Sequence, residues 1–543
     1  MKVKLLIASL VATAMLTGTA QAADGPAKSW QPPARLNRPT LRSLQALNGS
    51  SALVQLVRGE RGRAAKALIR GAGGRLISQT LRIWLVPPAT RSILPVLIRR
   101  DALIGLERNG SLRRSATFAF SDPLWPNEWW RSAVGAESAP PLAAGVPLTI
   151  LDSGLDVTHP EFQGSHITLL NQQFLGDADD DDHGTAVTSV AAAPANGFGM
   201  VGIYPDANVW EWDGRSYTNA EFIAGIDAAI RRGPSVINMS WGSNSYDPLL
   251  EVELLVAFGT GSIPVAAAGN EFVQGNPIEY PASFNHVLTV AATDRANEPS
   301  YFSNSKYAVD LAAPGENIVV AVPYAFNPNG FDLSNGTSFS APIVAAATAG
   351  VWSMRRNLDN TQMFDLMRFS ARDIWNEDYD PDTGFGLLDI PTALSQQAPG
   401  PDHSEPNEDI YMVKAGGPFS TAAPPLTSPG HGQSMTRARL DFTEDPEDVY
   451  RVFVPARRTI FVRVAGDDDV NVEMWRLRTQ SVYERGPAQQ RDLLGISEKK
   501  GTSPDTIAVR NRTARGGFIY ADVFLGKEAG SANYSLSVRT SSK

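Results

Sequence analysis

The chain has 543 residues, of which 43% are hydrophobic and 19% are charged, and its formal net charge is −9. This composition is typical of a globular protein with several domains and excludes wholesale disorder. The acidic balance disfavours nucleic acid and anionic membranes as main partners, because neither attracts an acidic surface. The sequence contains no cysteine, which excludes disulfides, Cys-rich zinc sites and thiol nucleophiles.

The first residues have the pattern of a secretory signal peptide. Lys2 and Lys4 precede an apolar run over residues 5–16, and Ala20-Gln21-Ala22 has the small-x-small form of a cleavage site. A retained anchor is the alternative, but the run is shorter than the roughly 20 residues that a membrane-spanning helix needs. We therefore predict a signal peptide over residues 1–22, no transmembrane segment, and a secreted or periplasmic bacterial protein.

A small unit follows the signal peptide. Residues 23–50 are rich in Pro, Ala, Ser and Gln and are predicted to be a flexible leader, and residues 51–114 are predicted to fold compactly. The spacing of apolar residues within that unit indicates alternating strands and helices. The expected strands cover residues 51–58, 74–87 and 104–107, and the expected helices cover residues 62–71 and 89–100.

From Val146 the sequence changes to short apolar strands that alternate with helices. We expect strands at residues 148–152, 208–212, 235–239, 263–267 and 287–291, and helices at residues 184–193, 219–231, 247–259 and 361–370. Continuous apolar strands separated by helices predict an α/β domain, with a parallel sheet covered on both faces. Functional groups are expected at the carboxyl ends of such strands. This domain is predicted to extend over residues 115–394.

The C-terminal third has a different pattern. Residues 395–408 form a Pro-punctuated acidic linker. Residues 409–543 alternate β-branched and aromatic residues with polar ones, which predicts an antiparallel β-sandwich. Four histidines lack the spacing of metal ligands and are predicted to be surface or loop residues: His166, His286, His403 and His431.

Three potentially reactive side chains lie at strand-to-helix junctions of the middle domain. Asp152 ends a predicted strand, His183 opens a helix, and Ser338 lies in the turn Gly336–Pro342 before an apolar helix. Each alone has an ordinary explanation as a turn residue or a helix cap. Together they supply the nucleophile, base and orienting acid that amide hydrolysis needs. Asn270, just past a strand end, is a candidate oxyanion donor together with the Ser338 N–H.

Seven segments occur in order over roughly residues 122–394: ILDSGLDVTHP, DDHGTAVTSVAA, VINMSWGS, VAAAGNE, YPASFNHVLTVAATD, DLAAPGE and GTSFSAP. This set resembles the subtilisin-like serine proteases, in which the triad follows the order Asp, His, Ser. The resemblance implies a secreted serine endopeptidase of subtilisin-like fold that requires no cofactor for its chemistry. It makes Asp152, His183 and Ser338 the triad and Asn270 the oxyanion donor. Ala186 and Ile343 depart from the family, since both replace frequent histidines.

The resemblance also implies where a protein or peptide substrate binds. Family members hold the peptide as an added strand against backbone that corresponds to Ser240, Trp241 and Gly242 and to Ala267, Ala268 and Gly269. The other rim corresponds to Asp213 and Gly214. Glu279 precedes Tyr280-Pro281, at the floor of the pocket for the side chain before the scissile bond. A carboxylate there favours Arg or Lys; alternatively, Glu279 turns to solvent.

The small unit at residues 51–114 resembles the inhibitory propeptide of the family. The chain would thus carry its own intramolecular inhibitor, and Arg113-Arg114 before Ser115 is a candidate self-cleavage point. The C-terminal sandwich resembles the small β-domains that follow many secreted bacterial peptidases. The alternative function is a catalytically silent secreted binding or scaffold protein that uses this sandwich.

Acidic residues outside the triad offer oxygen ligands. The run Asp177–Asp182, interrupted only by Ala178, either binds a cation, attracts a basic side chain or is a solvated loop. Subtilisin-like enzymes often bind structural calcium through such groups. Further donors are Glu161, Asp378, Asp380 and Asp382, and the sequence assigns no metal ligands.

Overall fold

The computed structural model describes residues 39, 44, 47, 51–58, 60–78, 82–108, 120–172, 181–214, 216–306, 308–421, 423–483, 486, 490–527 and 529–541. The predicted signal peptide, most of the leader, Arg113-Arg114, Ser115 and residues 177–180 of the acidic run lie outside these residues, as do the side chains of Asp181 and Asp182. Two compact units divide the chain: one comprises Thr13–Ala116, and the other comprises Met1–Ala12 and Thr117–Lys543. Within the described ranges, none of the helices is long and apolar enough to cross a membrane.

The unit Thr13–Ala116 is a small α+β structure whose antiparallel sheet has the strand order β2-β3-β1-β4. Every second residue of β1 is buried, so one face of the sheet is covered. Val54, Ile69, Trp84 and Leu97 meet in its core, which both helices complete. The predicted order of strands and helices is confirmed. The elements are β1 (Ala52–Leu56), α2 (Glu60–Gly71), β2 (Arg75–Ser78), β3 (Ile83–Val86), α3 (Leu94–Arg99) and β4 (Leu103–Arg108).

The middle domain is built on a seven-stranded sheet of order β11-β10-β9-β8-β5-β7-β6. All of its strand pairs are parallel, so the α/β prediction is confirmed. β6 and β11 were not predicted. The strands are β5 (Leu148–Asp152), β6 (His166–Leu169), β7 (Asn208–Asp213), β8 (Val236–Met239), β9 (Ile263–Ala267), β10 (Leu288–Thr293) and β11 (Leu311–Pro314), and a hairpin of β12 (Ile318–Ala321) and β13 (Phe331–Ser334) lies outside the sheet.

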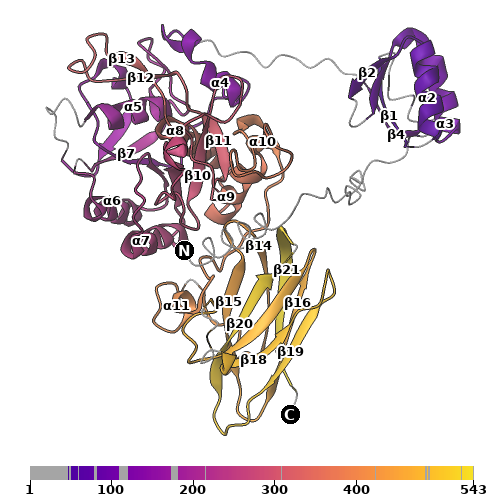
Figure 1. Ribbon diagram of the computed structural model, residues 1–543, viewed down its shortest axis with the longest axis vertical. Helices are drawn as coiled ribbons and strands as arrows, with labels where there is room; N and C mark the ends of the chain where they lie inside the picture. Colours follow the sequence, from indigo (N-terminus) through magenta and orange to yellow (C-terminus); the bar gives the residue numbers. More distant parts are fainter. Residues whose placement is uncertain are drawn as a thin grey trace. The chain divides into compact units, whose positions relative to one another are not determined.

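Helices cover both faces of this sheet (Figure 1). On one face, Ile150 and Val265 pack with residues of α5 and α8, and on the other face, Leu151 and Met239 pack with residues of α6 and α7. Apolar side chains on both faces explain the continuous apolar strands. The helices are α4 (Trp129–Ala133), α5 (Asp181–Ala192), α6 (Asn219–Arg232), α7 (Pro248–Gly259), α8 (Thr337–Met354), α9 (Asn360–Phe369) and α10 (Ile390–Ser395).

The central helix α8 begins at Thr337, earlier than the apolar run alone indicates, and contains Pro342. Proline has no N–H, so the usual helical bond from residue 342 to the carbonyl of Ser338 is missing. The Ser240 hydroxyl donates to that carbonyl instead, at 2.8 Å. This contact ties the first turn of α8 to the end of β8.

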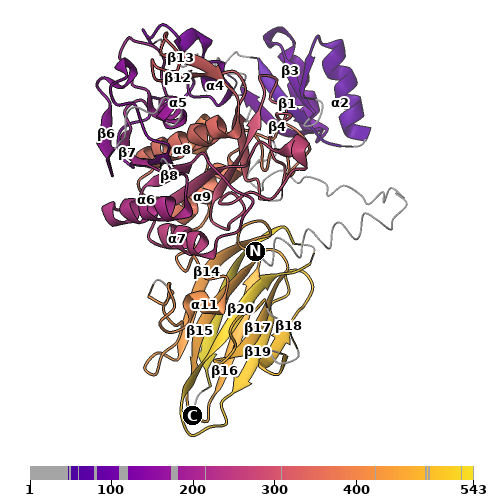
Figure 2. The same cartoon turned by 60° about the vertical axis from the view of Figure 1, so that its left-hand side comes forward.

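The C-terminal part is an antiparallel β-sandwich, as predicted (Figure 2). One sheet has the order β14-β21-β16-β19 and the other has the order β15-β20-β17-β18. Val452, Val462, Val472 and Leu536 belong to the shared core. Its elements are α11 (Ile410–Val413), β14 (Gln433–Asp441), β15 (Glu447–Val454), β16 (Thr459–Gly466), β17 (Val470–Arg476), β18 (Leu493–Ser497), β19 (Asp505–Arg510), β20 (Gly517–Leu525) and β21 (Ser531–Thr540).

Candidate active site

Asp152 and His183 form a hydrogen-bonded pair at the carboxyl edge of the sheet. Asp152 is the last residue of β5 and is fully buried, and its Oδ1 lies 2.7 Å from His183 Nδ1. A carboxylate oxygen accepts, so Nδ1 of His183 donates the proton of this bond, and Nε2 is the other ring nitrogen. Oδ1 also accepts from the backbone N–H of Ser153 at 2.8 Å. The orientation of the His183 imidazole is therefore fixed by the last residue of a buried strand.

Close backbone packing places His183 beside β5. His183 lies in the first turn of α5, and the next residue is Gly184. A Cβ on Gly184 would come within 2.1 Å of the Gly154 carbonyl oxygen, so only glycine permits this approach. The Ser153 hydroxyl accepts from the Gly184 N–H at 2.9 Å. The segments that carry Asp152 and His183 are thus held directly against each other.

Ser338 lies in the first turn of α8, where backbone N–H groups lack partners within the helix. Gly336 precedes the helix with a φ of 149°, a conformation that favours glycine. The Ser338 hydroxyl donates to the Ser240 carbonyl at 3.2 Å, and the ring of the adjacent Phe339 lies 6.0 Å from the ring of His183. The serine therefore stands at the same sheet edge as the Asp152–His183 pair.

Asn270 is fixed beside this turn by its side-chain carbonyl. Its Oδ1 accepts from the Thr337 N–H at 2.8 Å and from the Thr337 hydroxyl at 3.0 Å. This leaves its NH₂ group as the donor that can serve a substrate. The structure thus brings Asn270 to the turn that carries Ser338, as an oxyanion donor must be.

The predicted substrate-binding residues line the ends of neighbouring strands. Ser240 follows β8, Ala267 ends β9, and Ala268 is buried beside β10, to whose Val290 carbonyl its N–H donates at 2.9 Å. Asp213 ends β7, and the Gly214 N–H donates to the Asp152 carbonyl at 2.7 Å. Trp241 stacks on Phe222, with ring centroids 3.8 Å apart. All of these segments meet at the carboxyl edge of the sheet.

Glu279 is buried, with 7% of its surface exposed, so it does not turn to solvent. Ideal Cβ positions on Gly242 and Gly269 would lie 2.9 Å from its Oε2 and 2.7 Å from its Cγ, so its side chain runs between these two glycines. Burial and the neighbouring Glu271 carboxyl raise the pKa of Glu279 to about 7. In the described residues, Oε2 of Glu279 has no hydrogen-bond partner.

Three residues near the site escaped the sequence analysis. The Tyr217 hydroxyl donates to Asp152 Oδ1 at 3.0 Å, and Glu271 accepts from the Asn270 N–H at 2.8 Å. Tyr217 has no sequence signal, because only the fold brings it to Asp152, whereas Glu271 ends the motif VAAAGNE and could have been found beside Asn270. Thr337 could have been found, since it belongs to the serine motif. The departures Ala186 and Ile343 are both buried in the core that α5 and α8 share.

His286 was predicted to be a surface or loop residue; it lies in a loop but is not on the surface. His286 is only 4% exposed, and its ring stacks on Phe258 at 4.4 Å. Its partners are acidic residues more than a hundred positions away, which spacing along the chain cannot reveal. His166 and His431 are exposed, as expected, and so is His403, whose side chain is 79% exposed.

The acidic donors named from the sequence have different surroundings. Asp380 belongs to a turn in which it accepts from the N–H groups of Asp382 and Thr383 at 2.8 and 3.0 Å. Glu161 is fully buried, and burial raises its pKa to about 8. Its Oε2 accepts from Met200 N–H at 3.1 Å, while its Oε1 has no partner among the described residues. Glu161 therefore has one oxygen without a partner in the described residues, whereas Asp380 stabilises its own turn.

Comparison with known proteins agrees with this geometry. Residues 143–395 match the model of the subtilase family. Subtilisin amylosacchariticus of Bacillus subtilis is 30% identical over 257 residues, which cover 46% of this chain and 66% of that protein. Subtilisin DY of Bacillus licheniformis is 29% identical over 258 residues, covering 46% of this chain and 91% of that protein.

Longer and more distant matches are also found. A probable subtilase-type serine protease of Deinococcus radiodurans is 27% identical over 414 residues, so the match spans 62% of this chain and 54% of that relative. The crystal structure of the psychrophilic subtilisin-like protease Apa1 from an Antarctic Pseudoalteromonas covers 50% of this chain and 99% of its own, with 19% identity and a TM-score of 0.45. On the family match at residues 143–395, this chain carries a domain of the subtilase family.

Proposed function

We propose that the chain is a secreted serine endopeptidase that is made as a precursor. The observation that carries this proposal is the Asp152–His183 pair at 2.7 Å, at the sheet edge where Ser338 opens α8 and Asn270 is anchored to Thr337. A nucleophile, a base, an orienting acid and oxyanion donors are what peptide-bond hydrolysis requires.

Each residue has one role in the reaction. Ser338 attacks the peptide carbonyl, and His183 takes its proton at Nε2 and returns it to the leaving amine. Asp152 orients His183 and stabilises the imidazolium. The Asn270 NH₂ group and the Ser338 N–H hold the oxyanion, helped by the positive end of the α8 dipole. Water then releases the acyl group from Ser338 by the same proton transfers.

Labelling with a serine-directed fluorophosphonate tests the proposal. We expect one label on the matured protein, at Ser338, and none on Ser338→Ala. Ser243→Ala is the matched control, because Ser243 is an exposed hydroxyl whose backbone pairs with Tyr280 beside the same cleft; this variant should label normally. A folded parent that takes no label supports the silent scaffold instead, and labelling that persists in Ser338→Ala places the nucleophile elsewhere.

The pocket before the scissile bond is proposed to accept Arg or Lys. Glu279 lies between Gly242 and Gly269, the backbone that the family uses as pocket walls, and Glu271 lies close by. A guanidinium or ammonium would supply the positive charge that these two carboxyls lack, with a bidentate arrangement open to arginine. The preference thus rests on the buried carboxyl of Glu279 and the adjacent carboxyl of Glu271 rather than on sequence position alone.

The test compares peptides of equal length that carry Arg, Lys or Phe immediately before the cleaved bond. We expect a higher kcat/KM for Arg and Lys, and loss of that advantage in Glu279→Gln. Glu298→Gln, at an exposed acid of the turn at residues 294–298, is the control and should keep the selectivity. A clear preference of the parent for Phe would contradict the proposed Arg or Lys preference but would not affect the assignment of the triad.

The unit around residues 51–108 is proposed to be an inhibitory propeptide that self-cleavage removes. Its four-stranded sheet and two helices fold around a core of their own, as an independent inhibitor requires. The basic pair Arg113-Arg114 matches the proposed pocket. Mass spectrometry of the secreted protein shows whether the unit has been cleaved off. The Ser338→Ala variant should stay uncut when expressed alone, and normal maturation of that variant would rule out self-processing.

A further inference from the structure

Four buried acidic side chains come together where the linker meets the sandwich. Asp402 and Glu405 precede α11, Asp445 lies between β14 and β15, and Asp448 lies in β15. One carboxylate oxygen from each lies within 4.8 Å of those of the other three. Their exposed fractions are 6%, 7%, 9% and 0%, respectively. They are brought together by the fold from two separate stretches of the chain.

Oxygens of this cluster lack hydrogen-bond donors. In the described part of the chain, no partner is found for Glu405 Oε1, Asp445 Oδ1 or Asp448 Oδ1. The same holds for Oδ1 of Asn407, whose residue is fully buried. A buried polar oxygen that has lost water and gained no donor is costly, and native structures contain few of them. Several such oxygens converging on one place indicate a ligand that accepts their lone pairs.

The donors that do reach the cluster are mostly neutral. Asp402 accepts from the backbone N–H groups of Arg439 at 2.9 Å and Ser404 at 3.3 Å. Asp448 Oδ2 accepts from the Tyr534 hydroxyl at 2.6 Å. Such contacts orient carboxylates but do not cancel their mutual repulsion, which is strong away from water.

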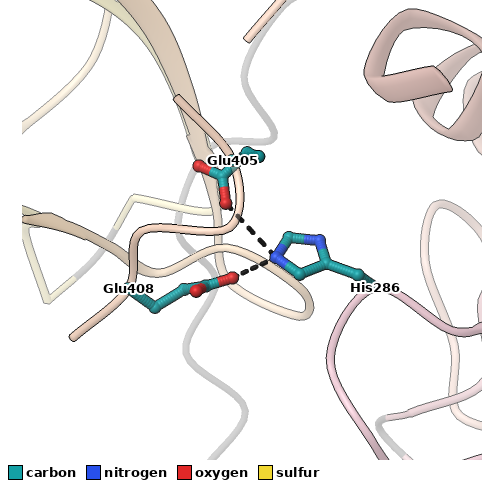
Figure 3. Close-up of side chains that lie close together, drawn as sticks. All are labelled: His286, Glu405 and Glu408. Atoms are coloured by element: carbon teal, nitrogen blue, oxygen red, sulfur yellow. Dashed lines mark hydrogen bonds and ion pairs between the residues drawn. The ribbon is translucent and has the colours of Figure 1, made fainter. Parts of the chain in front are cut away.

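The nearest charged partners are already engaged by acids. His286 contacts Glu408, which is also buried, and lies 3.2 Å from Glu405 Oε2 (Figure 3). Arg368 is held by three other carboxylates, Asp310, Asp365 and Asp441, all within 3.1 Å. Arg439 lies 3.6 Å from Asp365. One imidazolium therefore faces a group of buried carboxyl groups, and their joint ionisation without a further cation is unfavourable.

A small cavity of about 30 Å³ adjoins these side chains, and Asp402, Glu405 and Asp445 are among its lining residues. That space is enough for one ion or one water molecule. We propose that Asp402, Glu405, Asp445 and Asp448 bind a Ca²⁺ ion, with Asn407 Oδ1 as a further oxygen ligand.

The donor set favours calcium over other cations. All of the proposed ligands are oxygen atoms, which a hard cation prefers, and Ca²⁺ accepts six to eight of them in flexible geometry. Mg²⁺ demands a near-ideal octahedron and keeps its waters, which suits a buried site poorly. Structural Zn²⁺ sites are built mainly from Cys and His ligands, whereas the four proposed ligands are all carboxyl groups and the Nε2 atom of His286 already contacts Glu405 and Glu408.

The ion would fasten the linker to the sandwich. Asp402 and Glu405 come from the linker, and Asp445 and Asp448 come from the sandwich. Glu405 also contacts His286, which lies just before β10 of the middle domain. Calcium would therefore stabilise the attachment of the sandwich to the linker and hold Glu405 where it meets His286.

Calcium binding and thermal unfolding of the full chain test this site, in a Ser338→Ala background that prevents self-digestion. In equilibrium dialysis, Asp445→Asn should bind one Ca²⁺ fewer per chain than its parent. Asp467→Asn, an exposed acid of the same sandwich that pairs with Asn533, should bind as many as the parent. An unchanged stoichiometry in a folded Asp445→Asn overturns the proposal.

The unfolding midpoint provides a signature that does not depend on counting ions. Calcium should raise the unfolding midpoint of the parent, because binding to the folded chain adds ligand-linked stability. The midpoint of Asp445→Asn should rise much less, because this variant lacks one ligand of the site. Should Asp445→Asn not fold, the parent alone decides: a midpoint that calcium leaves unchanged, or that Zn²⁺ raises and Ca²⁺ does not, contradicts a calcium site.

Discussion

Replacement of Arg368 by methionine should strongly destabilise the part of the chain that contains the middle domain and the sandwich. The Arg368 guanidinium is fully buried and lies within 3.1 Å of Asp310, Asp365 and Asp441. It also donates to the Thr443 hydroxyl at 2.6 Å. Asp441 ends β14 of the sandwich, whereas Arg368 lies in α9. This network therefore joins the two domains through one cation.

The expected loss follows from the burial of the three acids. Their side chains are 1%, 17% and 7% exposed, so methionine would deprive three largely buried acids of the Arg368 cation, while Asp365 keeps Arg439 at 3.6 Å. Breaking a buried ion pair in this way costs about 3–5 kcal/mol. The guanidinium carbon also lies 5.4, 5.2 and 5.1 Å from the ring centres of Phe364, Phe369 and Phe385. Methionine keeps an unbranched apolar side chain at this position, so the loss reports the missing guanidinium rather than a large cavity.

Urea unfolding in the Ser338→Ala background, at fixed calcium concentration, measures the effect. The matched control is Arg231→Met, whose partner Asp227 lies on the same helix and whose side chain is 68% exposed; exposed pairs contribute about 0–1 kcal/mol. A loss below about 1 kcal/mol for Arg368→Met, or one equal to that of Arg231→Met, would refute the reasoning.

The loss of stability caused by Arg368→Met should also depend on pH. Burial opposes ionisation of Asp441, but Arg368 outweighs it, and the pKa of Asp441 is lowered from its usual value. A carboxyl whose pKa is lower in the folded state stabilises the fold above its unfolded pKa, which is about 3.9. That contribution is lost as pH falls through the folded pKa. The difference between the parent and Arg368→Met should thus shrink below about pH 4.

Three further substitutions and one titration follow from the site. Asn270→Ala should lower kcat by roughly 10²–10³ with little change in KM, as measured by steady-state hydrolysis, because it removes one oxyanion donor. Gly184→Ala should lower the unfolding midpoint and the activity together, since its Cβ would meet the Gly154 carbonyl oxygen at 2.1 Å. Tyr217→Phe should reduce kcat/KM by less than about tenfold, in keeping with loss of one hydrogen bond to Asp152. Burial and Glu271 raise the pKa of Glu279 to about 7, so protonation below that pH should remove its charge. The ratio of kcat/KM for Arg peptides to that for Phe peptides should therefore decrease as the pH is lowered through 7. A ratio that does not change with pH argues against Glu279 as the selecting group.

Much of the middle domain could be predicted because its signals are local. Buried strands such as 148–152 are continuous apolar runs bounded by turn residues, and the motifs that follow them mark the sheet edge. β6 was missed because it is a short edge strand of which His166 and Leu169 are exposed, so no apolar run marks it. The N-terminal limit of α8 was missed because Pro342 conceals a helix that Ser240 stabilises from outside.

The polar interior could not be predicted in the same way. His286 meets Glu405 and Glu408, and Arg368 meets Asp441, across more than seventy residues of chain. No period or spacing encodes such contacts, because they depend on how the domain and the sandwich pack. Glu279 was recognised from its motif, whereas the structure was needed to show that Glu271 lies close to it.

The central claim is that Ser338 is a nucleophile that forms an acyl-enzyme. Pre-steady-state hydrolysis of an activated ester with a chromogenic leaving group tests it most directly, on matured protein of known concentration. The account predicts a burst of one leaving group per chain, followed by slower turnover, and no burst from Ser338→Ala. Turnover without a burst together with full activity of Ser338→Ala would contradict it.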